Sequence, residues 1–162
     1  MNRIAARISA ILLLIVTGCA TPQLGELFSD APSPPNNHAL VYVYRVHSPP
    51  YLRTPALYVD GIKAVGIADR GYSWLNIRGG EHDFEVRWPW DLKALNIKKT
   101  VTLQAGKTHY FFLAGDFALE GLTTITSSGF GEVSEEEARD AIKQCRFVKP
   151  LVHEIDKEGT LP

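Results

Sequence analysis

Between residues 39 and 133 the chain consists of short apolar segments, and several of them alternate apolar with polar side chains. The alternation is clearest at 81–88, where His82, Phe84 and Val86 share one face and charged residues occupy the other. This period of two predicts a strand with one buried and one exposed face. We expect further strands at 40–46, 56–59, 62–67, 72–77, 98–103, 108–113 and 119–127, and a short, less regular one at 130–133.

Turn-forming residues separate these segments. Asp60–Gly61 between two apolar runs predicts a tight hairpin, because a type I′ turn needs a positive φ at both central residues. Three prolines make 47–55 a loop, and Pro89 and Gly115–Asp116 are expected to break the strands around them. Both faces of the segment 40–46 are largely apolar, so we expect it in the middle of its sheet.

One helix is predicted near the C-terminus. Ser134 followed by Glu137 forms a capping box, which satisfies backbone donors of the first helical turn. The apolar stripe that follows ends at Cys145 with the spacing i, i+3, i+4, i+7, so this thiol is expected to be buried and inert. The predicted fold is therefore a mostly antiparallel β-sandwich of about seven or eight strands with one C-terminal helix.

The first nineteen residues have the pattern of an export signal. Two arginines precede the apolar run 8–16, which is too short to span a bilayer and has the length of a signal-peptide core. Val16-Thr17-Gly18-Cys19 follows and resembles the lipobox of bacterial lipoproteins, which implies cleavage between Gly18 and Cys19 and acylation of the Cys19 thiol. The alternatives are an ordinary secretory signal with an incidental cysteine, or an uncut N-terminal anchor.

Acyl chains on Cys19 would hold the protein to a membrane. Each buried methylene contributes about 0.8 kcal/mol, and two or more chains make the attachment stable. The residue after Cys19 is Ala20 rather than aspartate, which in lipoproteins of bacteria with two membranes implies export to the outer membrane. We therefore expect a lipid-anchored protein of the bacterial cell envelope, at the outer membrane and facing the periplasm.

The segment after the cleavage site contains four prolines and several small polar residues, which favour an extended tether over a packed element. Alternatively, Leu24, Leu27 and Phe28 form a short turn against the folded domain. The expected division of the chain is a signal peptide at 1–18, a lipidated N-terminus and tether at 19–38, the folded domain at 39–150 and a flexible tail at 151–162.

Composition limits the classes of partner. The formal net charge is −1, with 17 basic and 18 acidic residues, so the chain lacks the basic excess of a phosphate-binding domain. No nucleic-acid partner is therefore expected. Cys19 and Cys145 are the only cysteines, which are too few for a disulfide scaffold.

Few residues are candidates for chemistry. His82 and His109 lie beside predicted turns and could share a metal ion, but such a site needs three or four ligands, and no H-x-H or H-E-x-x-H spacing occurs. A structural strand histidine is favoured at both positions, and no metal, cofactor or catalytic residue is predicted. Trp88 and Trp90 flank Pro89 near a loop tip and are the candidates for contact with a partner. The interpretation that we favour has Trp88 closing the core and only Trp90 exposed.

Four motifs resemble those of the DUF2846 family, which comprises small bacterial lipoproteins of unknown function. They are Ala39-Leu-Val-Tyr-Val-Tyr-Arg45, Leu57-Tyr-Val-Asp-Gly61, Gly79-Gly-Glu-His82 and Leu103-Gln-Ala-Gly-Lys-Thr-His-Tyr110. Gly79 replaces the usual proline of the family, and His109 stands where tyrosine is commoner. The resemblance covers about residues 39–148. Its motifs mark strands and turns of a β-sandwich, so it supports the fold and implies no enzymatic activity.

These observations favour a non-enzymatic, membrane-anchored envelope lipoprotein that acts as a binding or structural module. Its partner would be an envelope protein or a glycan. The alternative is a small envelope hydrolase or metal-dependent enzyme, although the chain contains no G-x-S-x-G elbow and no phosphate-binding loop motif. A binding module predicts an apolar patch near Trp88 and Trp90, whereas an enzyme predicts a pocket with convergent polar groups.

Overall fold

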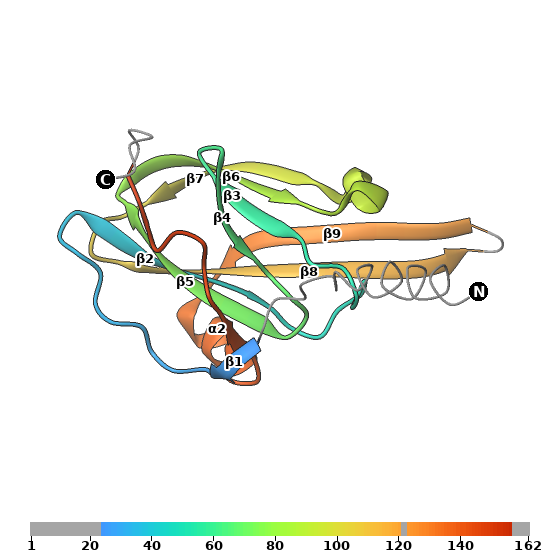
Figure 1. Cartoon of the computed structure of the whole chain (residues 1–162), viewed down its shortest axis with the longest axis horizontal. Coiled ribbons are helices and arrows are strands. Elements are labelled where there is room, and N and C mark those ends of the chain that lie inside the picture. The colour runs from blue at the N-terminus through green and yellow to red at the C-terminus, as the bar shows by residue number, and fades with distance from the viewer. Residues whose placement is uncertain (1–23, 121–122, 157–162) are drawn as a thin grey trace, which may run out of the picture.

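The structure is a computed structural model that describes residues 24–120 and 123–156. Within these residues eleven strands form two sheets, accompanied by one α-helix and one short 3-10 helix (Figure 1). The predicted β-sandwich with a C-terminal helix is confirmed, with eleven strands in place of the expected seven or eight. Gly18 and Cys19 lie outside the described residues, as does the rest of the expected signal peptide.

The larger sheet has seven strands. They are β1 (Leu24–Leu27), β2 (His38–Arg45), β5 (Gly71–Arg78), β8 (Thr108–Glu120), β9 (Thr123–Val133), β10 (Arg146–Val148) and β11 (Glu154–Ile155). Their order is β1-β10-β5-β2-β8-β9, and β11 also pairs with β5. Because β2 occupies one edge of β5 along its whole length, β10 and β11 share the other edge. β2 lies between β5 and β8, as its two apolar faces predict.

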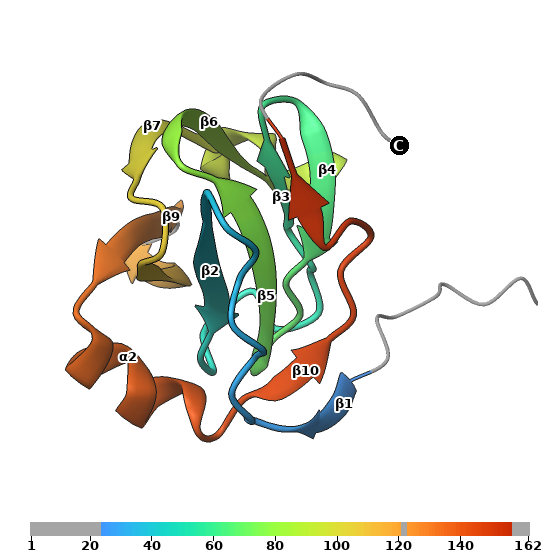
Figure 2. The same ribbon diagram turned by 90° about the vertical axis from the view of Figure 1, so that its left-hand side faces the viewer.

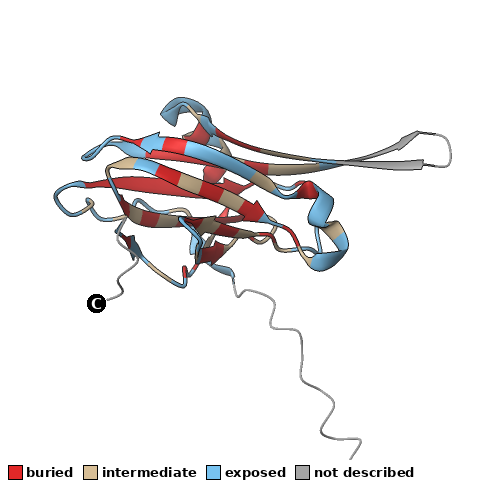
Figure 3. Ribbon diagram, turned by 90° about the horizontal axis from the view of Figure 1, so that it is seen from above, coloured by how far each residue is buried: buried red, intermediate tan, exposed pale blue. Residues whose placement is uncertain are grey.

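The smaller sheet has four antiparallel strands. In spatial order they are β4 (Ile62–Gly66), β3 (Ala56–Val59), β6 (Gly80–Arg87) and β7 (Ile97–Leu103). The predicted hairpin between β3 and β4 is confirmed, and its turn residues Asp60 and Gly61 have φ values of 50° and 83°. The alternation predicted for β6 is also present, and alternate buried and exposed residues are visible along the strands in Figure 3.

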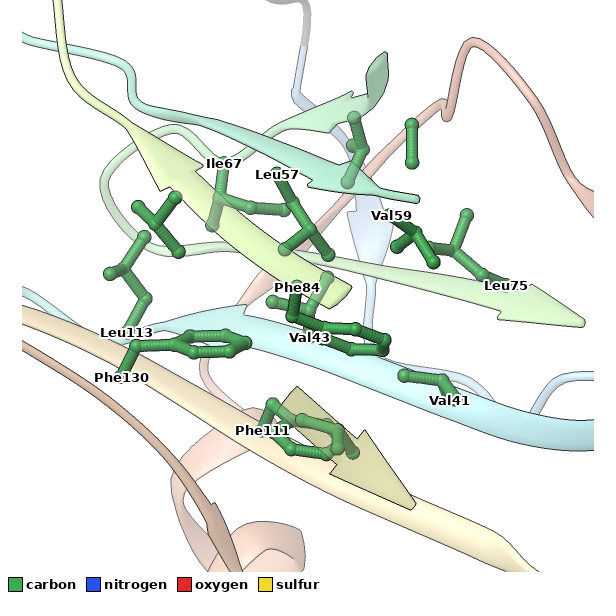
Figure 4. Close-up of a cluster of buried hydrophobic side chains, with 14 of the residues drawn as sticks. Val41, Val43, Leu57, Val59, Ile67, Leu75, Phe84, Phe111, Leu113 and Phe130 are labelled. Carbon is green, nitrogen blue, oxygen red and sulfur yellow. The ribbon is translucent and has the colours of Figure 1, made fainter. Parts of the chain in front are cut away.

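A first apolar layer fills the space between the sheets. Val41, Val43 and Leu75 of the larger sheet contribute to it, and they face Leu57 and Phe84 of the smaller sheet (Figure 4). All five side chains are at most 1% exposed. This layer accounts for one of the two apolar faces of β2.

A second apolar layer covers the outer face of the larger sheet. Tyr42 and Tyr72 belong to it, Phe28 packs against both rings, and the buried residues of α2 (Glu135–Ile142) complete the layer. Figure 2 shows α2 on the side of β2 that is remote from β3 and β4. The helix begins as predicted, since the Ser134 hydroxyl accepts a hydrogen bond from the Glu137 amide.

Cys145 is fully buried in this outer layer, as predicted. Burial raises the pKa of its thiol to about 12. The thiolate is the reactive form of cysteine, so the folded protein keeps this residue inert at neutral pH.

The expected break at Gly115–Asp116 is absent. β8 runs through both residues and pairs with β9 along its length. A Cβ atom at position 115 would collide with the carbonyl oxygen of Pro49. The glycine therefore allows the loop 46–55 to pack against the strand, and it does not end the strand.

Both ends of the described chain are held by the larger sheet. Leu24 and Leu27 lie in the exposed strand β1, which pairs with β10, rather than in the turn of the alternative, and only Phe28 of that group packs against the outer layer. At the other end β11 pairs with β5, and Ile155 is 1% exposed, although a tail was expected from residue 151. Neither of the two helices in the described residues is long and apolar enough to cross a membrane.

Candidate functional site

The two predicted partner-contact residues lie where β6 ends. Trp88 follows the strand and is 4% exposed, and its indole nitrogen donates a hydrogen bond to the Ser128 hydroxyl over 3.1 Å. Trp90 begins the 3-10 helix η1 (Trp90–Leu95) and is 83% exposed. Trp88 therefore closes the core and Trp90 faces solvent, as we favoured from the sequence.

Two more large side chains are exposed beside η1. In the loop 46–55, Tyr51 is 51% exposed and Leu52 is 91% exposed. The loop is tied to η1 by Arg53, whose Nη2 lies 2.7 Å from Oδ2 of Asp91. A depression of about 370 Å³ lies between the loop and the helix, and its lining residues are Pro49, Pro50, Tyr51, Leu52, Arg53, Asp91 and Leu92. We call this depression, with Tyr51, Leu52 and Trp90, the apolar end.

A buried arginine fixes the loop that carries Tyr51 and Leu52. Arg45 is the last residue of β2 and is fully buried. Its terminal nitrogens donate to three loop carbonyls, those of Ser48 at 2.7 Å, Pro50 at 2.9 Å and Arg53 at 2.8 Å. The guanidinium carbon also lies 5.2 Å from the centre of the Trp88 ring. The loop is therefore held from beneath by charge-assisted hydrogen bonds.

Burial disfavours the positive charge of Arg45, but other parts of its surroundings favour that charge. Burial lowers the pKa of the guanidinium, and the Coulombic attraction of Asp69 acts in the opposite direction. The carbonyl dipoles and the face of the Trp88 ring both stabilise a cation. Arginine stays protonated in proteins, so this side chain remains a fixed positive donor beneath the loop.

The apolar end exposes residue types that are common in protein interfaces. Binding hot spots are enriched in tryptophan, tyrosine and arginine, and Trp90 directly precedes Asp91, which lines the depression. A loop that is already fixed loses less conformational entropy when a partner binds. The arrangement can receive an apolar side chain in the depression, with the Arg53–Asp91 pair as a polar rim.

A larger groove lies on the outer face of the bigger sheet. It has a volume of about 940 Å³ and is bounded by residues 30–37, the turn before β8 and Arg139 of α2. Tyr42 and Tyr110 line it, with their rings stacked 5.2 Å apart. Burial raises the pKa of both phenols, that of Tyr110 to about 12, so neither serves as a base at neutral pH. Arg139 is engaged by Asp30, with 2.9 Å between Nη1 and Oδ1.

His82 and His109 do not come together. They lie in different sheets, and a carboxylate oxygen lies 2.6 Å from Nδ1 of each ring. Both nitrogens of each ring are engaged, by Asp60 and the Arg78 carbonyl for His82, and by Glu132 and the Gln104 amide for His109. Each histidine joins neighbouring segments of the chain, which is the structural role that we favoured.

A different histidine meets two carboxylates. Nε2 of His38, at the start of β2, lies 3.3 Å from Oδ1 of Asp156 and 3.6 Å from Oε1 of Glu154. No sequence pattern singles out these residues, because more than a hundred positions separate His38 from the other two and no spacing rule links them. The alternation Glu154-Ile155-Asp156 was the available signal, since it places both carboxylates on one face of a strand.

The fold defines the class of protein, a small β-sandwich of two unequal sheets with a helix on its outer face. The sequence model of DUF2846, a protein family of unknown function, matches residues 35–121, which is more than half of the chain. The chain therefore belongs to the DUF2846 family, as the four motifs indicated. Comparison with curated proteins and with solved structures gives no match.

Proposed function

We propose that this protein is a lipid-anchored module of the bacterial envelope that binds a partner protein through the apolar end. The observation that carries the proposal is the joint exposure of Tyr51, Leu52 and Trp90 on segments fixed by Arg45 and by the Arg53–Asp91 pair. Burying apolar surface contributes about 25 cal/mol per Å². A partner that covers these three side chains would gain that free energy.

The composition of the apolar end favours a protein over a glycan. Leu52 has no hydrogen-bonding group, and the depression beside it is lined mainly by prolines, Tyr51 and Leu92. Protein interfaces place such side chains at a central apolar patch with a polar rim. The Arg53–Asp91 pair lies at the margin of this patch and supplies that rim.

The anchor is proposed from the N-terminal pattern. A short apolar core followed by Gly18 and Cys19 supports cleavage before Cys19 and acylation of its thiol. Attachment to a membrane raises the effective concentration of the module toward partners on the same surface. Labelling with a radioactive fatty acid tests this step by itself. A Cys19→Ser variant that is still processed and still partitions with membranes would contradict it.

Crosslinking in the native envelope tests the docking surface. Wild-type lipoprotein, Trp90→Ala and Leu52→Ser would be crosslinked in parallel, and the recovered proteins quantified by mass spectrometry. Leu151→Ser is the matched control, because Leu151 is 66% exposed and lies outside the apolar end. We expect one partner that wild type and Leu151→Ser recover equally and that both variants of the apolar end lose at least tenfold.

Two outcomes would overturn the proposed surface. Equal recovery of the partner by Trp90→Ala and Leu52→Ser would show that binding occurs elsewhere. In the second outcome, the non-acylated protein binds phospholipid vesicles directly and Trp90→Ala loses this binding. The apolar end would then be assigned to lipid contact.

A further inference from the structure

Three side chains meet at the end of β2 that is opposite to Arg45. His38 begins β2, Glu154 lies in β11, and Asp156 directly follows β11. β11 pairs with β5 so that Ile155 lies opposite Ile77, while His38 lies opposite Arg78 on the other edge of β5. Ile155 belongs to the core between the sheets, so its two neighbours face the outer side of the sheet, as His38 does.

The His38 side chain is nine-tenths buried and has a nitrogen without a hydrogen-bond partner. Its Nδ1 lies 3.2 Å from the carbonyl oxygen of Asn36. A carbonyl only accepts hydrogen bonds, so Nδ1 carries a proton. The side chain is 9% exposed, and its buried Nε2 has no aligned partner among the described residues.

The unpartnered nitrogen faces negative charge. It lies 3.3 Å from a carboxylate oxygen of Asp156 and 3.6 Å from one of Glu154. In neutral histidine with the proton on Nδ1, Nε2 presents a lone pair. A cation placed between such a lone pair and the two carboxylates is attracted by all three groups.

We propose that His38, Glu154 and Asp156 bind a divalent transition-metal ion of the zinc class. Tetrahedral zinc with bonds of about 2.0–2.2 Å places its ligand atoms about 3.3–3.6 Å apart. The two distances from Nε2 are close to this spacing, and one ligand atom of each residue lies within 4.8 Å of the others. Three protein ligands leave a fourth position for water or for a group from a partner.

The second nitrogen of His38 supports the same assignment. Metal-bound histidine almost always donates its other N–H to a carbonyl or carboxylate, which fixes the ring and its tautomer. The Asn36 carbonyl provides that acceptor. Imidazole also distinguishes the ion, because calcium and magnesium prefer oxygen ligands whereas zinc accepts nitrogen and oxygen.

One cation of the protein competes for the site. Nη1 of Arg78 lies 3.9 Å from Oδ1 of Asp156. The Arg78 side chain is 55% exposed, so solvent weakens this pair and the side chain is free to turn away. Removing this competitor should therefore strengthen metal binding.

Binding would fasten the C-terminal strand. β11 has two residues, and the proposed ligands flank Ile155, which is buried in the core. An ion bound to His38 would link β11 to β2 across β5. The proposed site is thus a clip at the edge of the larger sheet, and it does not depend on the apolar end.

Zinc titration of the untagged full-length protein, after treatment with a chelator, tests the site. We expect one equivalent of Zn²⁺ to bind with micromolar or tighter affinity by calorimetry. His38→Gln, Glu154→Gln and Asp156→Asn should each weaken binding at least tenfold, and Arg78→Gln should tighten it two- to fivefold. His47→Gln is the matched control, because His47 is half exposed and meets the single carboxylate of Asp69 at 2.7 Å.

Three results would overturn the site. They are failure of the wild type to bind zinc, unchanged affinity in both His38→Gln and Glu154→Gln, and binding of Ca²⁺ or Mg²⁺ as tight as that of Zn²⁺. Circular dichroism would verify that each variant is folded. Glu154 and Asp156 are half exposed, so their variants test the ligands even if His38→Gln does not fold.

Discussion

Two basic side chains are buried at the two ends of β2, and their surroundings differ. Arg45 donates to three backbone carbonyls and lies over the ring of Trp88. His38 has one carbonyl partner on Nδ1, while its Nε2 faces the carboxylates of Glu154 and Asp156 without an aligned hydrogen bond. Among the described residues, Nε of Arg45 also has no hydrogen-bond partner. Asp69 acts on Arg45 only through Coulombic attraction, which raises the pKa of the guanidinium.

The difference separates a structural group from a candidate binding group. The hydrogen bonds of Arg45 explain why an arginine closes the first DUF2846 motif, because that side chain fixes the loop that follows β2. At His38, a ring nitrogen without an aligned hydrogen bond among the described residues meets two carboxylates, of which Asp156 has only the half-exposed Arg78 nearby. Four substitutions test this comparison, from the largest expected effect to the smallest.

Arg45→Met should cause the largest loss of stability. It leaves three carbonyls beneath the loop without their donor, and breaking such a buried polar network costs about 3–5 kcal/mol. Urea denaturation followed by tryptophan fluorescence would measure the loss. Arg53→Ala is the control, because it removes only a partly exposed ion pair worth about 0–1 kcal/mol. A loss below about 1 kcal/mol for Arg45→Met would refute the structural role of Arg45.

Gly115→Ala should lower the free energy of unfolding by about 1–3 kcal/mol, because the new methyl group would collide with the Pro49 carbonyl and push the loop outward. Gly129→Ala is the matched control in the partner strand. Its Cβ would meet the Phe112 ring at 3.5 Å, an ordinary contact. Thermal unfolding of both variants gives the comparison, and equal stability would show that the loop does not need this close approach.

His82→Leu should cost about 1–3 kcal/mol. The substitution keeps an apolar volume but removes the partners of Asp60 and of the Arg78 carbonyl, and a buried polar group without a partner carries that penalty. Chemical denaturation measures the change. A neutral or stabilising result would mean that the hydrogen bonds of His82 to Asp60 and to the Arg78 carbonyl contribute nothing beyond packing.

His38→Gln should have the smallest effect when metal is removed by a chelator, about 1 kcal/mol or less. Only one hydrogen bond, to the Asn36 carbonyl, is at risk, and such a bond contributes about 1 kcal/mol. Zn²⁺ should raise the melting temperature of the wild type and leave that of the variant unchanged. Thermal unfolding with and without the ion measures both. A large loss in the presence of chelator would place His38 with Arg45 as a structural residue.

Strong local patterns predicted most of the fold. The period of two in β6, the Asp60–Gly61 turn and the two apolar faces of β2 each have a direct physical cause, and each is present. β1 was missed because the prolines around it favoured a tether, and β10 and β11 were missed because strands of three and two residues carry no period. Gly115 was misread because its role depends on a loop more than sixty positions earlier.

The candidate sites were less predictable. Trp90 was found because an exposed tryptophan beside a proline is a local signal. Leu52 lies in a segment that the prolines mark only as a loop, so its exposure was not foreseen. His38 and Asp156 meet only through the pairing of β11 with β5, which no sequence rule predicts.

The late strands of the chain have a consequence for where it can be cut. β10 and β11 cover the free edge of β5, and α2 contributes to the apolar layer on the outer face of the larger sheet. A fragment that stops at residue 121 would keep the whole region that matches DUF2846 and would lose all three of these elements. Uncovered amides and carbonyls along Gly71–Arg78 would then offer a template to other molecules of the same fragment. The stretch that identifies the family is thus shorter than the stretch that covers both edges of β5.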